Sequence, residues 1–334
     1  MHHYTLKTSA KLPNWKAELA NAVTSVAELL RLLELDPDDG MVLPKPGFRL
    51  LVPRGFVNKM QAGNPDDPLL RQVLPLAVER ALGGYRDPVG DLDAMPSPGL
   101  VHKYRGRVLL LTTGACAIHC RYCFRRHFPY ASANPCKSQW QQALDYLKAH
   151  ADIEEVILSG GDPLVVDNDK LGQLLDALEQ ISHLRWLRIH TRLPVVLPAR
   201  IDDALTLQLR QRRFRTTLVI HANHANELMC DEADALQRLA TSGVTLLNQS
   251  VLLKGVNDSA TTLIALSKRL YEFGVLPYYL HLLDPAEGVM HFDVPQSRAI
   301  AILDALQAAL PGFLVPRLVR EIPGAASKTA IFTI

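Results

Sequence analysis

A tight group of cysteines is the first feature of this sequence that can do chemistry, because Cys116, Cys120 and Cys123 lie within eight residues. Thiolates are soft ligands, and three of them can bind three irons of a 4Fe–4S cube while the fourth iron stays open to an outside ligand. Zinc is the alternative metal, with His119 or His127 as its fourth ligand, but zinc folds normally place their ligands in two pairs. The spacing therefore favours a 4Fe–4S cluster with one open iron.

The other two cysteines, Cys136 and Cys230, stand apart from this group. An odd total of five cysteines, three of them clustered, is a poor disulfide framework for a chain of 334 residues. A lone cysteine is more often a small buried apolar side chain than a ligand, and we expect this of both residues.

The composition indicates a soluble globular protein. Hydrophobic residues make up 48% and charged residues 21% of the 334 residues, a length that fits one large α/β barrel or two modest domains. The formal net charge of +2 excludes a nucleic-acid binder that depends on bulk charge. No stretch approaches the ~20 apolar residues that span a bilayer, and the first 15 residues lack the apolar run of a secretion signal. We therefore expect a cytoplasmic protein without a membrane segment.

The elements that must position the cysteines follow a regular alternation from Arg105 onward. Short apolar runs typical of buried strands are separated by segments of helical length and periodicity, which predicts right-handed βαβ units and a parallel sheet. The fold class expected is α/β, a partial (β/α)6 barrel with an N-terminal helical extension. Strands are expected at 107–113, 154–161, 187–192, 216–223, 244–253 and 276–283, and helices at 137–150, 169–181, 231–243 and 259–274.

In a barrel of this type, catalytic groups gather where the strands end. The three cysteines follow the first expected strand, Gly160-Gly161-Asp162 ends the second, and Asp284 follows the last. The first hundred residues have a different pattern. Asn14 can cap a helix over 15–35, a second helix is expected within 64–82, and 87–99 is a Pro-, Gly- and Asp-rich loop. We expect a mostly helical region at 1–100 and the core barrel, with a C-terminal lysine segment, at 101–334.

The cysteine spacing, followed by the aromatic Phe124, resembles the radical S-adenosylmethionine superfamily. LLLTTGACAIHCRYCFRRHFPY, VPRGFVNKM, LSGGDPL, LLNQSVLLKGVND and REIPGAASK resemble its lysine 2,3-aminomutase family, from about Leu50 to Lys328. The resemblance implies an isomerase that converts L-α-lysine to β-lysine by radical 2,3-amino migration. It also implies a one-electron reductant similar to flavodoxin or ferredoxin, and use of the β-lysine by a ligase that acts on elongation factor P.

In such a family the open iron is chelated by the amino and carboxylate groups of S-adenosylmethionine. The resemblance implies that Gly160, Gly161 and Asp162 lie beside the methionyl amino group, with glycines where a close approach is needed. Three polar residues that end expected strands are candidates either for the adenosyl pocket or for hydrogen-bonded positions in the core: His190, His221 and Asn248.

The same resemblance implies a second cofactor, pyridoxal 5′-phosphate, held covalently by Lys328 in the segment IPGAASK. A lysine can do this when it is partly desolvated and neutral. Lys103, Tyr104 and Arg107 match family positions that contact the cofactor phosphate, although family members commonly have Arg where Lys103 stands.

The substrate contacts are also implied by the resemblance. Arg125 matches the arginine that binds the substrate carboxylate, a task suited to a bidentate guanidinium, and Arg126 is expected to be a solvated neighbour. Asp284 and Glu321 match the paired acids that bind the distant ammonium, with Glu321 standing where other members have Asp. Two carboxylates at a cationic end favour lysine.

Two other functions remain open from the sequence. The first is an aminomutase of the same family that acts on glutamate or arginine, which the two acids at the ammonium end disfavour. The second is an iron–sulfur protein without catalysis, which three rather than four clustered cysteines and the presence of Lys328 disfavour.

Overall fold

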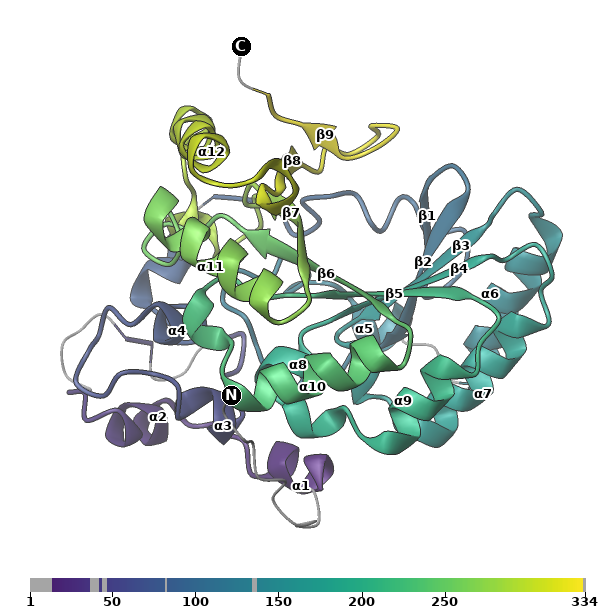
Figure 1. Ribbon diagram of the computed structural model, residues 1–334, viewed down its shortest axis with the longest axis horizontal. Helices are drawn as coiled ribbons and strands as arrows, with labels where there is room; N and C mark the ends of the chain where they lie inside the picture. The colour runs from purple at the N-terminus through teal and green to yellow at the C-terminus, as the bar shows by residue number, and fades with distance from the viewer. Residues whose placement is uncertain (1–13, 37–41, 44–46, 82, 134–136, 333–334) are drawn as a thin grey trace, which may run out of the picture.

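Seven parallel strands form the centre of an open nine-stranded sheet whose strand order follows the chain (Figure 1). The computed structural model describes residues 14–36, 42–43, 47–81, 83–133 and 137–332. Antiparallel strands β1 and β9 occupy the two edges, so the barrel is partial, as the sequence predicts. The strands are β1 (Leu100–Tyr104), β2 (Arg107–Thr113), β3 (Glu155–Gly160), β4 (Trp186–Thr191), β5 (Arg215–Ile220), β6 (Thr245–Val251), β7 (Leu276–His281), β8 (Arg317–Arg320) and β9 (Thr329–Ala330).

The six strands expected from the alternation are confirmed as β2 to β7, each to within three residues at either end. Central strands such as β3 are buried along nearly their whole length, because helices cover one face and cavity-lining side chains fill the other. Strands β1, β8 and β9 were not expected. They are short, and the two antiparallel pairs are hairpins whose turns contain Gly106 and Gly324, both at positive φ.

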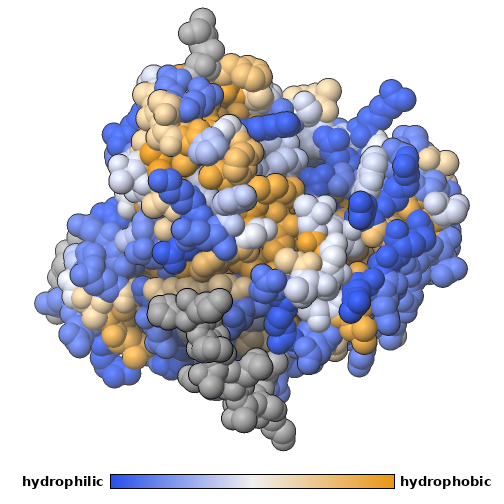
Figure 2. Space-filling view, in the orientation of Figure 1, coloured by the Kyte–Doolittle hydropathy of each residue, from blue (hydrophilic) through white to orange (hydrophobic). Residues whose placement is uncertain are grey.

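Long helices cover the outer face of the sheet (Figure 1). Side-chain caps fix the starts of two of them, α7 and α11: Asp167 accepts from the amide of Lys170, and Ser259 accepts from the amide of Thr262. Hydrophilic residues cover most of the surface on the side of α6 and α7, whereas apolar residues are more exposed around α11 and α12 (Figure 2). The long helices are α6 (Lys137–Ala149), α7 (Asn168–Glu179), α9 (Asp203–Arg210), α10 (Cys230–Thr241), α11 (Ala260–Glu272) and α12 (Gln296–Ala309).

The continuous helix expected over 15–35 is wrong. The chain forms α1 (Trp15–Ala20) and α2 (Val26–Leu32), separated by an extended segment. Within that segment Val23 is fully buried and forms an antiparallel bridge with Val52, and Ser25 then caps α2. The burial of Val23 and the Ser25 cap outweigh the helical periodicity of the segment. A local sequence pattern carries no information about a bridge to a distant residue such as Val52.

The helix expected within 64–82 is also shorter than predicted. Asp67 caps the single turn of α4 (Pro68–Arg71), and the chain resumes only as a 3-10 turn at Ala77–Arg80. Pro75 lacks an amide hydrogen and its carbonyl instead accepts from the amide of Leu43, which ends the helical pattern. The remaining short helices are α3 (Arg54–Val57), α5 (Tyr130–Ala133) and α8 (Leu193–Val196), with 3-10 turns at Pro163–Val165, Pro198–Arg200, Ala225–Glu227, Met290–Phe292 and Gly312–Leu314.

One large hydrophobic core joins the N-terminal region to the barrel. It contains Trp15 and Leu29 from the N-terminal helices together with barrel residues as far as Leu318. The division into regions 1–100 and 101–334 stays a prediction, since both regions contribute to this core. No helix among the residues that the structure describes is long and apolar enough to cross a membrane.

Candidate active site

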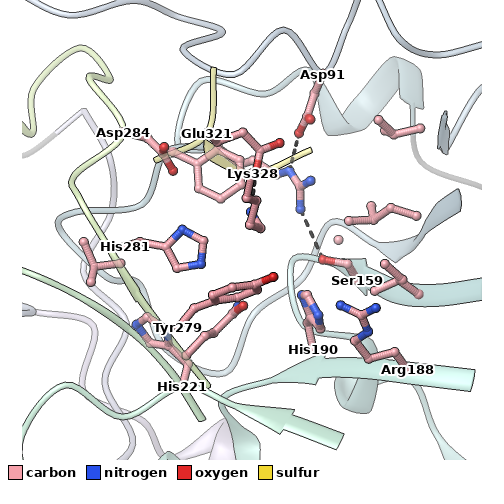
Figure 3. A pocket seen from close by; sticks show the side chains of 18 of the residues that line it. Asp91, Ser159, Arg188, His190, His221, Tyr279, His281, Asp284, Glu321 and Lys328 are labelled. Atoms are coloured by element: carbon pink, nitrogen blue, oxygen red, sulfur yellow. Dashed lines mark hydrogen bonds and ion pairs between the residues drawn. The ribbon is translucent and has the colours of Figure 1, made fainter. Parts of the chain in front are cut away.

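A cavity of about 590 Å³ opens inside the partial barrel and collects residues from nearly every strand (Figure 3). Fourteen of the sixteen candidate residues named from the sequence line it. One exception is Asn248, and the other is Cys116, which lines a second cavity on the N-terminal side of the cysteine loop. The structure therefore brings together Lys103, Tyr104, Arg107, Cys120, Cys123, Arg125, Gly160, Gly161, Asp162, His190, His221, Asp284, Glu321 and Lys328.

The cysteine loop follows β2 directly, and its three thiols influence one another. Burial, together with the charges of Cys123, Asp162 and Cys120, raises the pKa of Cys116 well above its usual range. Burial and the neighbouring Cys120 raise the pKa of Cys123 to about 11. Partly buried thiols that oppose each other's ionisation need a positive partner to become thiolates, and a metal cluster supplies one.

A single metal ion fits this loop poorly. Among the described residues, no group of three His, Cys, Asp or Glu side chains converges closely enough to hold one ion. In a 4Fe–4S cluster each thiolate binds a different iron, so the sulfurs do not have to converge. His119, the first candidate for a zinc ligand, instead contacts the carbonyl of Arg49 through Nδ1 at 2.8 Å. The arrangement favours the cluster over zinc.

The glycines of Gly160-Gly161-Asp162 are required by the backbone of the cysteine loop. A Cβ on Gly160 would lie 2.4 Å from the carbonyl oxygen of Thr113, and one on Gly161 would lie 2.1 Å from that of Ala115. The amides of Gly161 and Asp162 also donate to those two carbonyls, at 2.7 and 2.8 Å. The sequence interpretation explained the glycines by the close approach of a ligand. The structure adds a second explanation, because the absence of Cβ atoms lets the end of β3 form hydrogen bonds with the backbone of the cysteine loop.

Asp162 is saturated by internal hydrogen bonds. Its Oδ1 accepts from the amide of Leu164 at 3.0 Å and from the hydroxyl of Thr191 at 2.7 Å, while Oδ2 accepts from the amide of Arg192 at 2.7 Å. Burial raises the pKa of Asp162 to about 6, although these hydrogen bonds oppose the shift. Asp162 therefore fixes the end of β4 relative to the cysteine loop.

Arg192 is a site residue that the sequence interpretation missed. Its Nη1 lies 2.7 Å from the sulfur of Cys120, and its Nη2 donates to Gln72 at 2.8 Å and to Glu227 at 2.9 Å. All of these side chains except Cys120 are buried. Arg192 is the last residue of the strand expected at 187–192, and this position at a strand end is the signal in the sequence that could have indicated it.

His221 belongs to a buried polar network beside this arginine. Its Nε2 lies 2.8 Å from the Tyr122 hydroxyl, and Asn223 donates to the same hydroxyl at 2.8 Å. Burial and the nearby Arg192 lower the pKa of His221 to about 3, so the ring is neutral at physiological pH. Asn248 lies outside the cavity lining and bonds both backbone groups of Ala222, so its core interpretation is correct.

Arg125 is fixed at the rim of the cysteine loop by a residue from the N-terminal region. Its Nε donates to Asp91 at 2.7 Å, and its Nη1 donates to the hydroxyl of Ser159 at 3.2 Å. Asp91 is buried although it lies in the loop 87–99, and nothing in the sequence distinguishes it from the neighbouring acids Asp87 and Asp93. The loop therefore contributes directly to the site.

The three residues expected to contact a phosphate differ in how firmly neighbouring side chains already hold them. The ammonium of Lys103 lies 2.6 Å from Asp91 and 3.1 Å from Glu321, and it also donates to the carbonyl of Val89. The guanidinium of Arg107 lies over the ring of Tyr104, 4.7 Å from its centroid. Lys103 is thus committed to carboxylates, whereas Arg107 has no ion pair recorded among the described residues.

Asp284, Glu321 and Lys328 gather on one side of the cavity (Figure 3). Lys328 Nζ donates to Glu321 Oε2, and Lys103 donates to Oε1 of the same carboxylate. Burial alone would raise the pKa of Glu321, but the two ammonium groups outweigh it and lower that pKa to about 2. Burial and the charge of Glu321 raise the pKa of Asp284 to about 7, and its Oδ1 has no hydrogen-bond partner among the described residues.

Two further histidines line the cavity: His190, one of the three strand-end candidates, and His281, which the sequence interpretation did not name. Burial is the main cause that lowers the pKa values of His190 and His281 well below their usual range, so both rings are neutral. Arg188 lies beside His190 in Figure 3 and is held by Glu155 through hydrogen bonds of 2.6 to 2.9 Å. Neutral rings leave recognition of charged ligand groups to other lining residues, among them Arg125, Asp284 and Glu321.

Two expectations about residues near the site are wrong. Arg126 is a buried cation, not a solvated one: its Nη2 lies 2.8 Å from Glu79, which also pairs with Arg121. Cys230 is exposed at the start of α10, on the side of the first turn away from the buried Glu232. The expectation for Cys136 lies outside the described residues.

Comparison with known proteins agrees with this geometry. A family model described as a 4Fe-4S single cluster domain matches residues 104–187, which contain the cysteine loop and Gly160-Gly161-Asp162. The protein named L-lysine 2,3-aminomutase of Escherichia coli strain K12 is 48% identical over 335 residues, covering 99% of this chain and 97% of its own. The protein of the same name from Haemophilus influenzae is 48% identical over 320 residues and covers 95% of each chain.

Among solved structures, a radical SAM methyltransferase from Sphaerobacter thermophilus aligns with 66% of this chain and 68% of its own, at 14% identity and a TM-score of 0.48. The sequence relatives are far closer and nearly as long as this chain. They confirm the resemblance to the lysine 2,3-aminomutase family that the cysteine loop and the other quoted segments indicated. The chain is therefore a member of the lysine 2,3-aminomutase family.

Proposed function

We propose that this protein is an isomerase that converts L-α-lysine to β-lysine by moving the amino group from the α-carbon to the β-carbon. The observation that supports this most is the distribution of charge in the cavity. Arg125 offers a guanidinium near the cysteine loop, while Asp284 and Glu321 offer two carboxylates from the β7 and β8 side. L-lysine carries a carboxylate at one end and an ammonium at the other. Two relatives at 48% identity are named L-lysine 2,3-aminomutase.

Cys116, Cys120 and Cys123 would hold the cluster, with S-adenosylmethionine beside Gly160, Gly161, Asp162 and His221. The raised pKa values of Cys116 and Cys123 fit this donor set, because a cluster supplies the positive charge that thiolates need. When bound, the cluster and S-adenosylmethionine supply the one-electron step that begins radical chemistry, and pyridoxal phosphate holds the migrating amino group.

Lys328 would hold pyridoxal phosphate covalently, and the side chain fits the task because it lines the cavity and is about one-fifth exposed. Arg107 and Tyr104 are the better candidates for the cofactor phosphate. Lys103 supports the phosphate less directly, since its ammonium is bound to Asp91 and Glu321. The positive charge of Lys103 still lies in the cavity lining with Tyr104 and Arg107, and it favours binding of the cofactor phosphate there.

For the substrate, Arg125 would bind the carboxylate, and Asp284 and Glu321 would bind the distal ammonium. Asp91 orients the guanidinium of Arg125 through Nε. Asp284 contributes an oxygen that has no partner of its own in the described chain and so favours a donor brought by the ligand. Neutral His190 and His281 line the cavity between these charged groups without competing for them.

Glutamate and arginine are the alternative substrates. Glutamate would place a third carboxylate against Asp284 and Glu321, and arginine would need more length for a planar guanidinium. The reaction is tested by anaerobic incubation of reconstituted protein with S-adenosylmethionine, a one-electron reductant and each amino acid separately. Chiral chromatography should detect β-lysine from lysine alone. A β-amino product from glutamate or arginine at a higher rate would refute the substrate assignment.

The metabolic setting is a further part of the proposal. We propose that the enzyme works in the cytoplasm, receives electrons from a flavodoxin- or ferredoxin-like protein, and supplies β-lysine to a ligase that modifies elongation factor P. The resemblance of the sequence to the lysine 2,3-aminomutase family is the only support for the ligase. Deleting the gene should remove the lysine-derived mass from elongation factor P, and an unchanged mass would contradict this setting.

A further inference from the structure

We infer that Lys328 occupies the substrate's ammonium subsite until pyridoxal phosphate removes its charge, so that loading of the cofactor opens the site for lysine. This inference rests on the proposed function, which assigns the cofactor to Lys328 and the distal ammonium to Glu321 and Asp284. It goes beyond that function because it links the two assignments through one shared carboxylate.

The contact between the two residues is built into a hairpin. Strands β8 and β9 are antiparallel, with Arg320 opposite Thr329. The next facing positions along this pair are Glu321 and Lys328, which therefore lie side by side where the hairpin leaves its strands. Lys328 Nζ donates to Glu321 Oε2 at this point. The register of the hairpin places the two residues opposite each other, and this keeps the Lys328 ammonium beside the Glu321 carboxylate.

Both oxygens of Glu321 are already in use. Lys328 binds Oε2, and Lys103, which is anchored by Asp91 at 2.6 Å, binds Oε1 at 3.1 Å. An incoming ammonium would then meet a carboxylate whose charge is compensated. Only Asp284, with one unpartnered oxygen, remains to receive it. The repulsion between two neighbouring ammonium groups would oppose binding further.

Attachment of the cofactor changes this balance. The ammonium of Lys328 first loses one proton, and its lone pair attacks the aldehyde carbon of pyridoxal phosphate. The aldehyde oxygen then leaves as water with the two remaining nitrogen protons, so one water and one proton are released. Nζ can then no longer donate as an ammonium to Glu321. Its Oε2 becomes available to a ligand ammonium, while Lys103 continues to hold Oε1.

Removing the Lys328 charge by mutation should imitate this step without any cofactor. The probe is 6-aminohexanoate, which has the carboxylate and the distal ammonium of lysine but no α-amino group, and hexanoate is the control ligand. Binding is measured by calorimetry on cofactor-free protein. Lys328→Met should bind 6-aminohexanoate at least tenfold more tightly than the parent protein. Lys328→Arg, which keeps the positive charge, should bind as weakly as the parent, and so should Lys268→Met, a matched change on the exposed face of α11.

A double variant separates this inference from the proposed function. Adding Glu321→Gln to Lys328→Met should abolish the gain, and hexanoate should bind all variants alike. If Glu321→Gln weakens 6-aminohexanoate binding but Lys328→Met gives no gain, the inference fails while the ammonium assignment of Glu321 stands. If Glu321→Gln has no effect in either background, the assignment of Glu321 fails and the inference fails with it. Near-ultraviolet circular dichroism identifies any variant that has lost its fold.

Discussion

The guanidinium of Arg192 lies against the sulfur of Cys120, with 2.7 Å between Nη1 and Sγ, while its Nη2 pairs with Glu227 at 2.9 Å. The arginine is thus a fixed positive charge beside an expected cluster ligand, and Glu227 partly compensates it. A nearby cation stabilises the reduced form of a cluster, because reduction adds negative charge. The pair should therefore influence the cluster's reduction potential.

Arg192→Gln should lower that potential by on the order of 60 mV, the equivalent of a tenfold change in a one-electron equilibrium. Glu227→Gln should move it in the opposite direction, since it removes the compensating negative charge. Electron paramagnetic resonance during a redox titration, without S-adenosylmethionine, measures both shifts. Arg185→Gln, which alters an arginine 65% exposed at the surface, is the control. Shifts of the same sign in both test variants would indicate a merely structural effect.

The cysteine loop makes a direct prediction about metal content. Replacing Cys116, Cys120 or Cys123 by Ala removes a protein ligand from one iron, so each variant should retain far less iron after anaerobic reconstitution. Cys230→Ala, at an exposed position on α10, should retain the parent content. Iron analysis and the visible absorbance spectrum measure the outcome. A full complement of iron in any of the three variants would remove that cysteine from the ligand set.

Lys328 should be the residue labelled by pyridoxal phosphate. Borohydride reduction of the loaded protein makes the bond permanent, and mass spectrometry of the digested protein then locates it. Lys103 also lines the cavity and is a competing amine, but its ammonium is held by Asp91 and Glu321. Lys254 is exposed and serves as an indicator of non-specific labelling. A label found mainly on Lys103 or Lys254 would refute the assignment.

Lysine affinity should depend on pH through Asp284. Its pKa is raised to about 7 by burial and by Glu321, so the carboxyl is mostly neutral below pH 7 and mostly ionised above it. The lysine ammonium stays charged in this range. The KM for lysine should therefore fall as the pH rises through about 7, and the approach of the ammonium should move this midpoint downward.

Asp284→Asn keeps the shape of the side chain and removes its charge. Lysine turnover should fall by more than about tenfold, because losing one charged partner in a buried site costs on the order of 2–5 kcal/mol. The pH dependence of KM should flatten at the same time. The iron–sulfur spectrum should be unchanged, since Asp284 follows β7 whereas the three cysteines follow β2. Turnover within twofold of the parent would contradict the role of Asp284.

Gly161→Ala tests the backbone contact between the end of β3 and the cysteine loop. The added Cβ would lie 2.1 Å from the carbonyl oxygen of Ala115, so the loop must shift. We expect a loss of on the order of 1–3 kcal/mol in the free energy of unfolding and reduced iron retention. Gly312→Ala is the control, because its Cβ would meet nothing within 4 Å. Thermal unfolding and iron analysis measure the two effects, and parental stability in the Gly161→Ala variant would show that the loop adapts freely.

The sequence by itself determined the barrel and the cluster. The alternation of apolar runs and helical segments predicted β2 to β7 and the helices α6, α7, α10 and α11, because burial imposes a local pattern on each element. The helices α8 and α9, between β4 and β5, were not predicted. Spacing alone predicted the cysteine ligands, which lie within one loop. Local patterns failed at Val23 and Pro75, where bridges to distant segments outweigh helical periodicity.

Only the tertiary structure decided which charges face one another. Arg192 and Cys120 are 72 residues apart, and Lys103 and Glu321 are 218 residues apart. Such pairs form when strand ends converge inside the barrel, and no local pattern encodes which of many similar acids and bases will meet. Asp91 is the clearest case, since it lies in a polar loop and yet becomes buried between two cations. The free energy of a charge pair depends on distance and burial, and both are set by the packing of the whole chain.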